Sequence, residues 1–200
     1  MNILKTAETH MFIKRNNTMT KELSLPDERA SVQTFWAITF SILTAIGAQI
    51  EIPNQPVPYT LQTFFVLLAG ALLGKRSGSA SMGLYLILGA IGIPVFTGGA
   101  FGLSRILGPT GGYLLSFPIA AFVVGYLVKL RREFWWIMVS TVIGSFIIFT
   151  IGTIQLNIVY VHNWVNSIQA GFLIFSWWDG VKIIGVSTIA HHYFRKVNQP

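Results

Sequence analysis

Asp179 and Lys182 have the clearest capacity for chemistry, because an acid and a base stand three positions apart within an otherwise uncharged stretch. On a helix, residues three apart lie on the same face. A charged side chain at bilayer depth costs about 2.5–3.5 kcal/mol, and residues kept at that cost usually serve a function. We interpret the pair as a polar floor for a ligand. The alternative is an internal salt bridge that only neutralises two charges.

Arg105 is a second candidate, within the glycine-rich segment 96–112. A guanidinium group binds a carboxylate through two parallel hydrogen bonds, and neighbouring glycines let backbone donors come close. We therefore predict that Arg105 contacts the carboxylate of a ligand. An exposed loop arginine without a role is the alternative.

A proline-rich segment holds the third candidate, Gln62. Three prolines between residues 51 and 59 exclude a helix there, because each removes a backbone donor. Tyr59 and Gln62 at its end offer an aromatic wall and an amide. The segment is interpreted either as a lid over a binding site or as a structural hairpin between two helices.

The composition indicates an integral membrane protein. Of the 200 residues, 52% are hydrophobic and 10% are charged, too few charges to cover a soluble surface. The net charge of +7 is not clustered on one segment, so nucleic-acid binding is not expected. Cysteine is absent, His191 and His192 lack further ligands at metal-binding spacing, and no phosphate-loop or hydrolase motif occurs. We expect neither a metal nor a cofactor.

The apolar stretches predict an all-α bundle of six transmembrane helices, of which the second is short. A membrane span needs about 20 apolar residues, and the 21 residues from 30 to 50 carry no charge. We expect a polar N-terminal tail over 1–30, a membrane domain over 31–192 and a C-terminal tail over 193–200. The predicted spans cover about residues 32–50, 60–74, 78–95, 110–128, 134–156 and 168–190.

Cations support this topology. With six crossings, 12 of the 14 lysines and arginines fall on one face, which the positive-inside rule assigns to the cytosol together with both termini. Arg105 and Lys182 are the two exceptions. Lys182, near the middle of the last predicted span, must face protein or water rather than lipid.

A stripe of small residues, Ala37, Ser41 and Ala45, marks the first predicted span. Small side chains at four-residue spacing let another helix approach closely. That helix belongs either to the same bundle or to a partner subunit.

Several ordered motifs together resemble the BioY family, over about residues 33 to 192. They are Pro56-Val-Pro-Tyr-Thr-Leu-Gln-Thr63, Leu67-Leu-Ala-Gly70, Leu88-Gly-Ala-Ile-Gly-Ile-Pro-Val-Phe96, Gly108-Pro-Thr-Gly-Gly-Tyr113 and Asp179-Gly-Val-Lys182. The resemblance implies a six-helix biotin-binding S component of an energy-coupling factor transporter, in the cell membrane. Such a subunit is not an enzyme, and it works with a transmembrane coupling subunit and two cytosolic ATPases.

The resemblance also implies roles for single residues. We expect Asp179 to accept from a ureido N–H of biotin, Lys182 to support the buried polar end and Arg105 to hold the carboxylate, and the last two roles can be exchanged. Tyr113 and Trp178 are expected to form walls, and the stripe Ala37, Ser41 and Ala45 to serve coupling. An autonomous carrier or channel for a small carboxylate-bearing solute is the alternative function, and an intramembrane enzyme ranks third.

Overall fold

The structure is a computed structural model that describes residues 28–173 and 177–197. Residues 1–27 and 198–200, within the two predicted tails, lie outside the described residues. The chain divides into two compact units, Met1–Thr34 and Phe35–Pro200. The first is described only where helix α2 begins, and every contact discussed below lies within the second.

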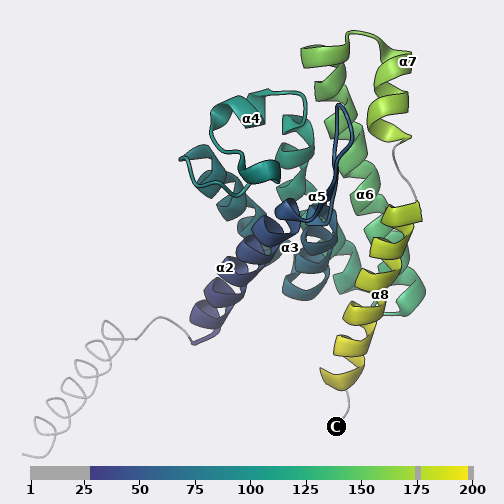
Figure 1. Cartoon of the computed structure of the whole chain (residues 1–200). Helices are drawn as coiled ribbons and strands as arrows, with labels where there is room; N and C mark the ends of the chain where they lie inside the picture. Colours follow the sequence, from purple (N-terminus) through teal and green to yellow (C-terminus); the bar gives the residue numbers. More distant parts are fainter. Residues whose placement is uncertain (1–27, 174–176, 198–200) are drawn as a thin grey trace, which may run out of the picture. The chain divides into compact units, whose positions relative to one another are not determined.

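Helices make up nearly all of the described chain (Figure 1). The helix predicted over about 134–156 is confirmed: α6 covers these residues, and a π-helical segment extends it to Val161. The elements are α2 (Glu28–Gln49), β1 (Glu51–Ile52), β2 (Tyr59–Thr60), α3 (Gln62–Ala90), a 3₁₀ turn (Thr97–Gly99), α4 (Leu103–Leu107), α5 (Gly111–Leu130), α6 (Phe134–Leu156), π-helical Asn157–Val161, α7 (Trp164–Ser167), π-helical Ile168–Phe172 and α8 (Trp177–Val197).

Three helices of the described chain are long and apolar enough to cross a membrane. They comprise Ser31–Gln49, Gly111–Leu130 and Phe134–Val161. A fourth span results if the bent pair Trp164–Phe172 and Trp177–Val197 is counted as one. The membrane character predicted from composition is thereby supported, whereas the count of six crossings stays a prediction.

The proline-rich segment forms a hairpin between α2 and α3. β1 and β2 pair antiparallel, with Glu51 opposite Thr60 and Ile52 opposite Tyr59. The backbone N–H of Leu61 donates to the carbonyl oxygens of Gly47 and Ile50, both at 3.1 Å. These bonds fasten the base of the hairpin to the end of α2, so the segment is a hairpin between two helices; a role as a lid stays a prediction.

Helix α3 is interrupted at Gly74. Its φ of 78° and ψ of 178° are not helical, and only glycine adopts this backbone conformation readily. Just beyond, a Cβ at Gly78 would lie 2.8 Å from the carbonyl oxygen of Ala69, so the two halves are packed closely at the turn. The predicted boundary between the second and third spans is therefore one glycine, immediately before the cations Lys75 and Arg76.

The small-residue stripe of α2 packs inside the bundle. Ser81 of α3 donates its hydroxyl to the carbonyl oxygen of Ala37 at 2.7 Å, and Ser41 is only 1% exposed. Ala45 packs against the hydrophobic core. The small side chains serve the contact with α3. Ala37 and Ala45 are only half-buried, so the assignment of Ala37, Ser41 and Ala45 to a coupling interface stays a prediction.

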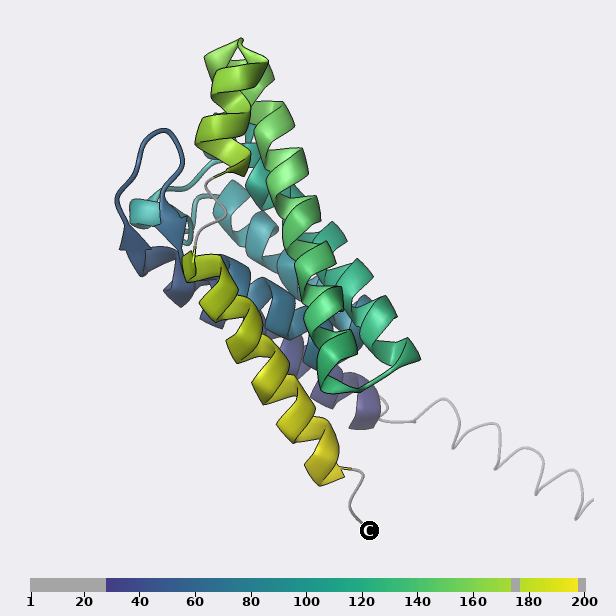
Figure 2. The same cartoon turned by 90° about the vertical axis from the view of Figure 1, so that its right-hand side faces the viewer.

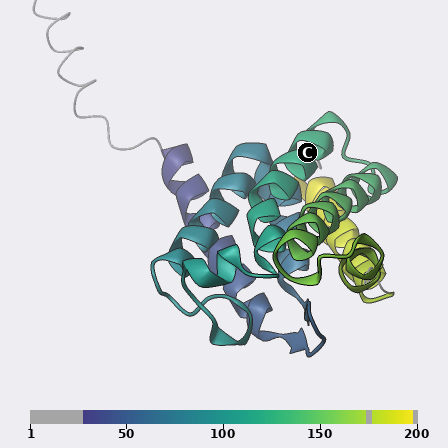
Figure 3. The ribbon, with the colours of Figure 1, turned by 90° about the horizontal axis from the view of Figure 1, so that it is seen from above.

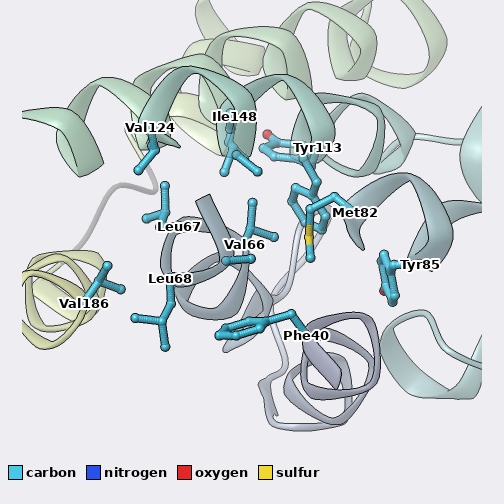
Figure 4. Packing of buried hydrophobic residues seen from close by; sticks show 14 of the residues in the cluster. Phe40, Val66, Leu67, Leu68, Met82, Tyr85, Tyr113, Val124, Ile148 and Val186 are labelled. Atoms are coloured by element: carbon cyan, nitrogen blue, oxygen red, sulfur yellow. The ribbon is translucent and has the colours of Figure 1, made fainter. Parts of the chain in front are cut away.

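Helix α5 lies between α3 and α6 (Figure 3). The approach is close because glycines stand at the contacts: a Cβ at Gly70 of α3 would lie 2.6 Å from the carbonyl oxygen of Ala121 in α5. Buried side chains from α2, α3, α5, α6 and α8 converge into one core (Figure 4). This core holds the ends of these helices in fixed relation, where the candidate site forms.

The last predicted span is broken. The segments Trp164–Phe172 and Trp177–Val197 are inclined to each other by 48°. Asp179 consequently lies in the first turn of α8, which corrects the prediction that it and Lys182 occupy the middle of one continuous helix. A carboxylate in the first turn is favourable because the amino end of a helix carries partial positive charge. α8 also continues to Val197, beyond the predicted end of the membrane domain at 192.

We predict that Gly74→Ala destabilises the protein by about 1–3 kcal/mol, because alanine does not adopt the backbone conformation of Gly74 without strain. Gly83→Ala, in the same helix, is the matched control. Neither position has a neighbouring atom within 4 Å of an added Cβ, but only Gly74 has a positive φ. Gly83→Ala should stabilise by about 0.5–1 kcal/mol. Denaturant titration in detergent micelles measures both, and equal effects would contradict the strain argument.

Candidate functional site

A cavity lies where the hairpin, the segment 96–110 and the starts of α3, α5 and α8 meet. Figure 2 shows the hairpin beside the first turns of α8. Polar side chains line one part of the cavity and aromatic or aliphatic side chains line the rest. The lining comprises Val57, Pro58, Tyr59, Thr60, Gln62, Thr63, Phe96, Thr97, Arg105, Thr110, Tyr113, Leu114, Phe117, Phe149, Asp179 and Lys182.

Asp179 and Lys182 are both buried and line this cavity. The Nζ of Lys182 lies 2.7 Å from Oδ1 of Asp179. It also donates to the carbonyl oxygen of Thr60 at 3.0 Å and to Oγ1 of Thr63 at 2.9 Å. An ammonium group has three N–H donors, so these contacts account for all of them. Lys182 therefore orients Asp179 and ties α8 to the hairpin and to the start of α3.

Gln62 is the centre of a second polar network on the cavity wall. Its Oε1 accepts from the hydroxyls of Thr60 at 3.0 Å and Thr97 at 3.2 Å. Its Nε2 donates to the hydroxyl of Tyr85, which donates in turn to the carbonyl oxygen of Val95 at 3.1 Å. The network joins the hairpin to residues 95–97, so Gln62 sets the spacing of two walls.

Arg105 reaches the cavity from the short helix α4 and is half-buried. Two glutamines outside the cavity hold the segment that carries it. Gln155 of α6 donates through Nε2 to the carbonyl oxygens of Ile106 at 2.9 Å and Gly108 at 2.8 Å. Gln49 of α2 donates to the carbonyl oxygen of Phe96 and accepts from the N–H of Gly99, both at 3.0 Å. The glycine-rich segment is thus held at both ends.

Aromatic rings form the apolar wall. The rings of Tyr113 and Phe149 meet edge to face with centroids 6.3 Å apart, and Phe117 lies one turn further along α5. The hydroxyl of Tyr113 donates to the carbonyl oxygen of Gly171 at 3.0 Å, so only its ring is offered to the cavity. A ligand with an apolar ring and polar ends suits this combination of walls.

Thr110 adds a polar group that the sequence analysis missed. Its Oγ1 is buried on the cavity lining, and within the described chain it has no hydrogen-bond partner. A buried hydroxyl without a partner loses free energy relative to one exposed to water, and a ligand can supply the missing bond. The motif Gly108-Pro-Thr-Gly-Gly, which sequence analysis used only for the family resemblance, contains this threonine.

The structure brings five of the six predicted ligand-binding residues to this cavity and leaves out one. Arg105, Tyr113 and Gln62 join Asp179 and Lys182 in the lining. Trp178 does not line it, because its neighbour Asp179 takes the inward position on α8. No cluster of three or more metal-ligating side chains occurs in 28–173 or 177–197.

Comparisons with known proteins agree on one family. A family model described as the BioY family matches residues 19–199. The biotin transporter BioY of Thermotoga maritima is 43% identical over 151 residues, which cover 76% of this chain and 89% of that protein. The probable biotin transporter BioY of Pyrococcus horikoshii is 57% identical over 86 residues, 43% of this chain and 53% of that protein. The biotin transporter BioY2 of Lactococcus lactis is 34% identical over 72% of this chain and 80% of that protein.

A solved structure has the same fold. The crystal structure of the S-component for biotin from an ECF-type ABC transporter superimposes with a TM-score of 0.79 at 25% sequence identity. The match covers 86% of this chain and 95% of that one. The helices described above therefore adopt the S-component fold.

We predict that Lys182→Met lowers the free energy of unfolding by about 3–5 kcal/mol, because it removes the cation from a buried ion pair. The double variant Asp179→Asn/Lys182→Met should recover much of this loss, since neither charge remains. Lys196→Met, at an exposed position of the same helix, is the control and should change little. Denaturant titration in detergent tests all three variants. A Lys182→Met variant as stable as the wild type would show that the pair has no structural role.

Proposed function

The chain belongs to the BioY family, and we propose that it is the biotin-binding membrane subunit of a biotin uptake transporter. It captures biotin from outside the cell and delivers it inward together with an ATP-driven coupling module. It is a transporter subunit and not an enzyme. The observation that carries the proposal is the buried Asp179–Lys182 pair on the wall of a cavity that Arg105 also lines.

The chemistry of the cavity matches biotin in three respects. The ureido ring needs acceptors for its N–H groups, and Asp179 supplies carboxylate oxygens. The apolar edges of the bicycle fit the aromatic wall formed by Tyr113, Phe117 and Phe149. Thr110 offers a hydroxyl to a polar atom of the ligand.

Arg105 is the residue that we assign to the carboxylate of the valerate tail. Lys182 was the alternative on sequence grounds, but its three N–H donors are directed to Asp179, Thr60 and Thr63. Arg105 comes from a different wall and is half-buried, which suits a tail that extends from the ring toward the cavity mouth. Lys182 then acts by holding Asp179 in position.

Six crossings with both termini in the cytosol fit the described helices. They are α2, the two halves of α3, α5, α6 and the broken pair of α7 and α8. The first half of α3 has 12 residues before Gly74, about 18 Å of helix, which agrees with a short second crossing. In this topology Lys75, Arg76, Lys129, Arg131 and Arg132 share the cytosolic face, and the candidate site opens on the other. We place the membrane domain at 31–192, between the two tails.

A transmembrane coupling subunit and two cytosolic ATPases are the proposed partners. The chain has no phosphate-loop motif, so the energy for uptake must come from elsewhere. An autonomous carrier or channel for a carboxylate-bearing solute is the competing function, because it also needs a charged site at membrane depth.

Titration calorimetry in detergent tests the site. Arg105→Gln should weaken biotin binding by about 10- to 100-fold, the loss expected for one charge-assisted hydrogen bond, and leave the binding of neutral biotinamide unchanged. Asp179→Asn should weaken the binding of both compounds, because the ureido ring is common to them. Trp178→Phe is the control and should alter neither. An Arg105→Gln variant that weakens both compounds equally would contradict the role of Arg105.

Uptake into liposomes separates the two functions. We expect the purified chain alone to bind biotin without accumulating it, and accumulation to require the coupling subunit, the ATPases and ATP. The competing function is tested by replacing ATP with a proton or sodium gradient across the liposome membrane. Accumulation driven by such a gradient with this chain alone would establish an autonomous carrier.

A further inference from the structure

A second cavity lies at the opposite ends of α5 and α8 from the candidate biotin site. Gly74 and Lys75 at the break in α3, Val128 and Lys129 at the end of α5, Arg132 and Phe194 contribute to its lining. From Tyr113 to Val128, α5 rises about 22 Å, so the two cavities are separated by most of the bundle. Nothing in the proposed capture of biotin uses this second cavity.

Three cations line the second cavity, and no acidic side chain does. In the described part of the chain the one salt bridge is that of Asp179 and Lys182, so Lys75, Lys129 and Arg132 have no carboxylate partner. Aromatic rings hold two of them: the Nζ of Lys75 lies 5.3 Å from the ring centre of Tyr126, and the guanidinium of Arg132 lies 4.7 Å from that of Phe194. These contacts position the cations but leave their charge uncompensated.

Lys129 has an ordinary structural role as well. It lies in the last turn of α5, where a cation offsets the partial negative charge of the terminal carbonyl groups. Lys75 directly follows the break at Gly74, where the first half of α3 ends, and Arg132 follows α5, so all three cations lie close to a helix end. Three cations and no acidic side chain on the lining of one cavity nevertheless suit an anion with several oxygen atoms.

The surroundings favour the phosphate group of a lipid. Exposed apolar side chains at positions 122, 126 and 130 form a stripe along α5, below the ammonium of Lys75. Trp135, at the start of α6, is 70% exposed, as expected for an aromatic residue at headgroup depth. A phosphodiester in the cavity would thus have apolar surface for its acyl chains directly beside it.

We propose that this cavity binds the headgroup phosphate of an anionic phospholipid, with Lys75, Lys129 and Arg132 as its cationic ligands. Basic pockets between transmembrane helices on the cytosolic side are suited to anionic headgroups. The bound lipid compensates three clustered charges and bridges the break in α3 to the end of α5. The inference does not depend on which solute the other cavity takes.

Native mass spectrometry of the full chain in detergent, with added phosphatidylglycerol, tests the proposal. The variant Lys75→Gln/Lys129→Gln/Arg132→Gln should bind this lipid at least about tenfold more weakly than the wild type. Arg76→Gln/Arg131→Gln/Arg195→Gln removes the same charge from the same end of the bundle but outside the cavity lining, and should stay within about threefold of the wild type. Phosphatidylcholine should not distinguish the three proteins.

Each contrary result overturns a defined part of the proposal. Equal losses in both triple variants would indicate diffuse attraction of anionic lipid to the whole face. Unchanged lipid binding by the cavity variant would exclude the cavity as a lipid site. If that variant also fails to associate with the coupling subunit, the cavity is a protein contact instead. Inorganic phosphate that displaces the lipid at equal concentration would indicate a free-anion site. Both variants should keep the biotin affinity of the wild type, which confirms that they are folded. If none of the three proteins binds biotin, the result counts against the proposed function and not against the lipid site.

Discussion

The contact of Lys182 with Asp179, Thr60 and Thr63 is the interaction on which the site depends. A lone charge at this depth would be costly, and the pair is tolerable because each charge compensates the other and the remaining donors of the ammonium are satisfied. Two of these bonds, to Thr60 and Thr63, join α8 to the hairpin and to the start of α3. One lysine therefore pairs with a buried carboxylate in an apolar bundle and also fixes the distance between two walls of the cavity. The proposed role of Asp179 as an acceptor for biotin follows from that arrangement.

Glycine and glutamine residues around the pair set how closely the helices pack and hold the irregular segment in place. Gly70 allows α3 and α5 to approach closely, and Gly74 lets α3 reverse within one residue. Gln49 and Gln155 satisfy backbone groups of the segment 96–110, which has little regular structure of its own. An irregular segment at membrane depth must have its polar groups satisfied by protein, because lipid offers none. The bonds from Gln49 and Gln155 therefore hold the segment that carries Arg105, although this segment contains no long helix or strand.

The two ends of the bundle differ in how charge is treated. At the end that holds the candidate site, acid and base are paired, hydrogen-bonded and buried. At the other end, Lys75, Lys129 and Arg132 line a cavity without any acidic side chain in its lining, which is acceptable only where water or lipid headgroups are within reach. This asymmetry agrees with the proposed topology.

The sequence alone predicted the membrane class, a helix over the residues of α6, the end of the second apolar stretch at Gly74, and five of the residues that line the cavity. These predictions depend on hydropathy, on the placement of charges along the chain and on the cost of isolated charges, all of which are local properties. The bend before α8, the inward turn of Asp179 in place of Trp178, the burial of Ser41 against α3 and the buried hydroxyl of Thr110 depended on the tertiary structure. Each is decided by which residues of distant segments come into contact, and a run of apolar residues carries no record of its partners. The proposed division of roles between Arg105 and Lys182 also rests on tertiary contacts, because only the positions of Thr60 and Thr63 reveal that the donors of the lysine are already engaged.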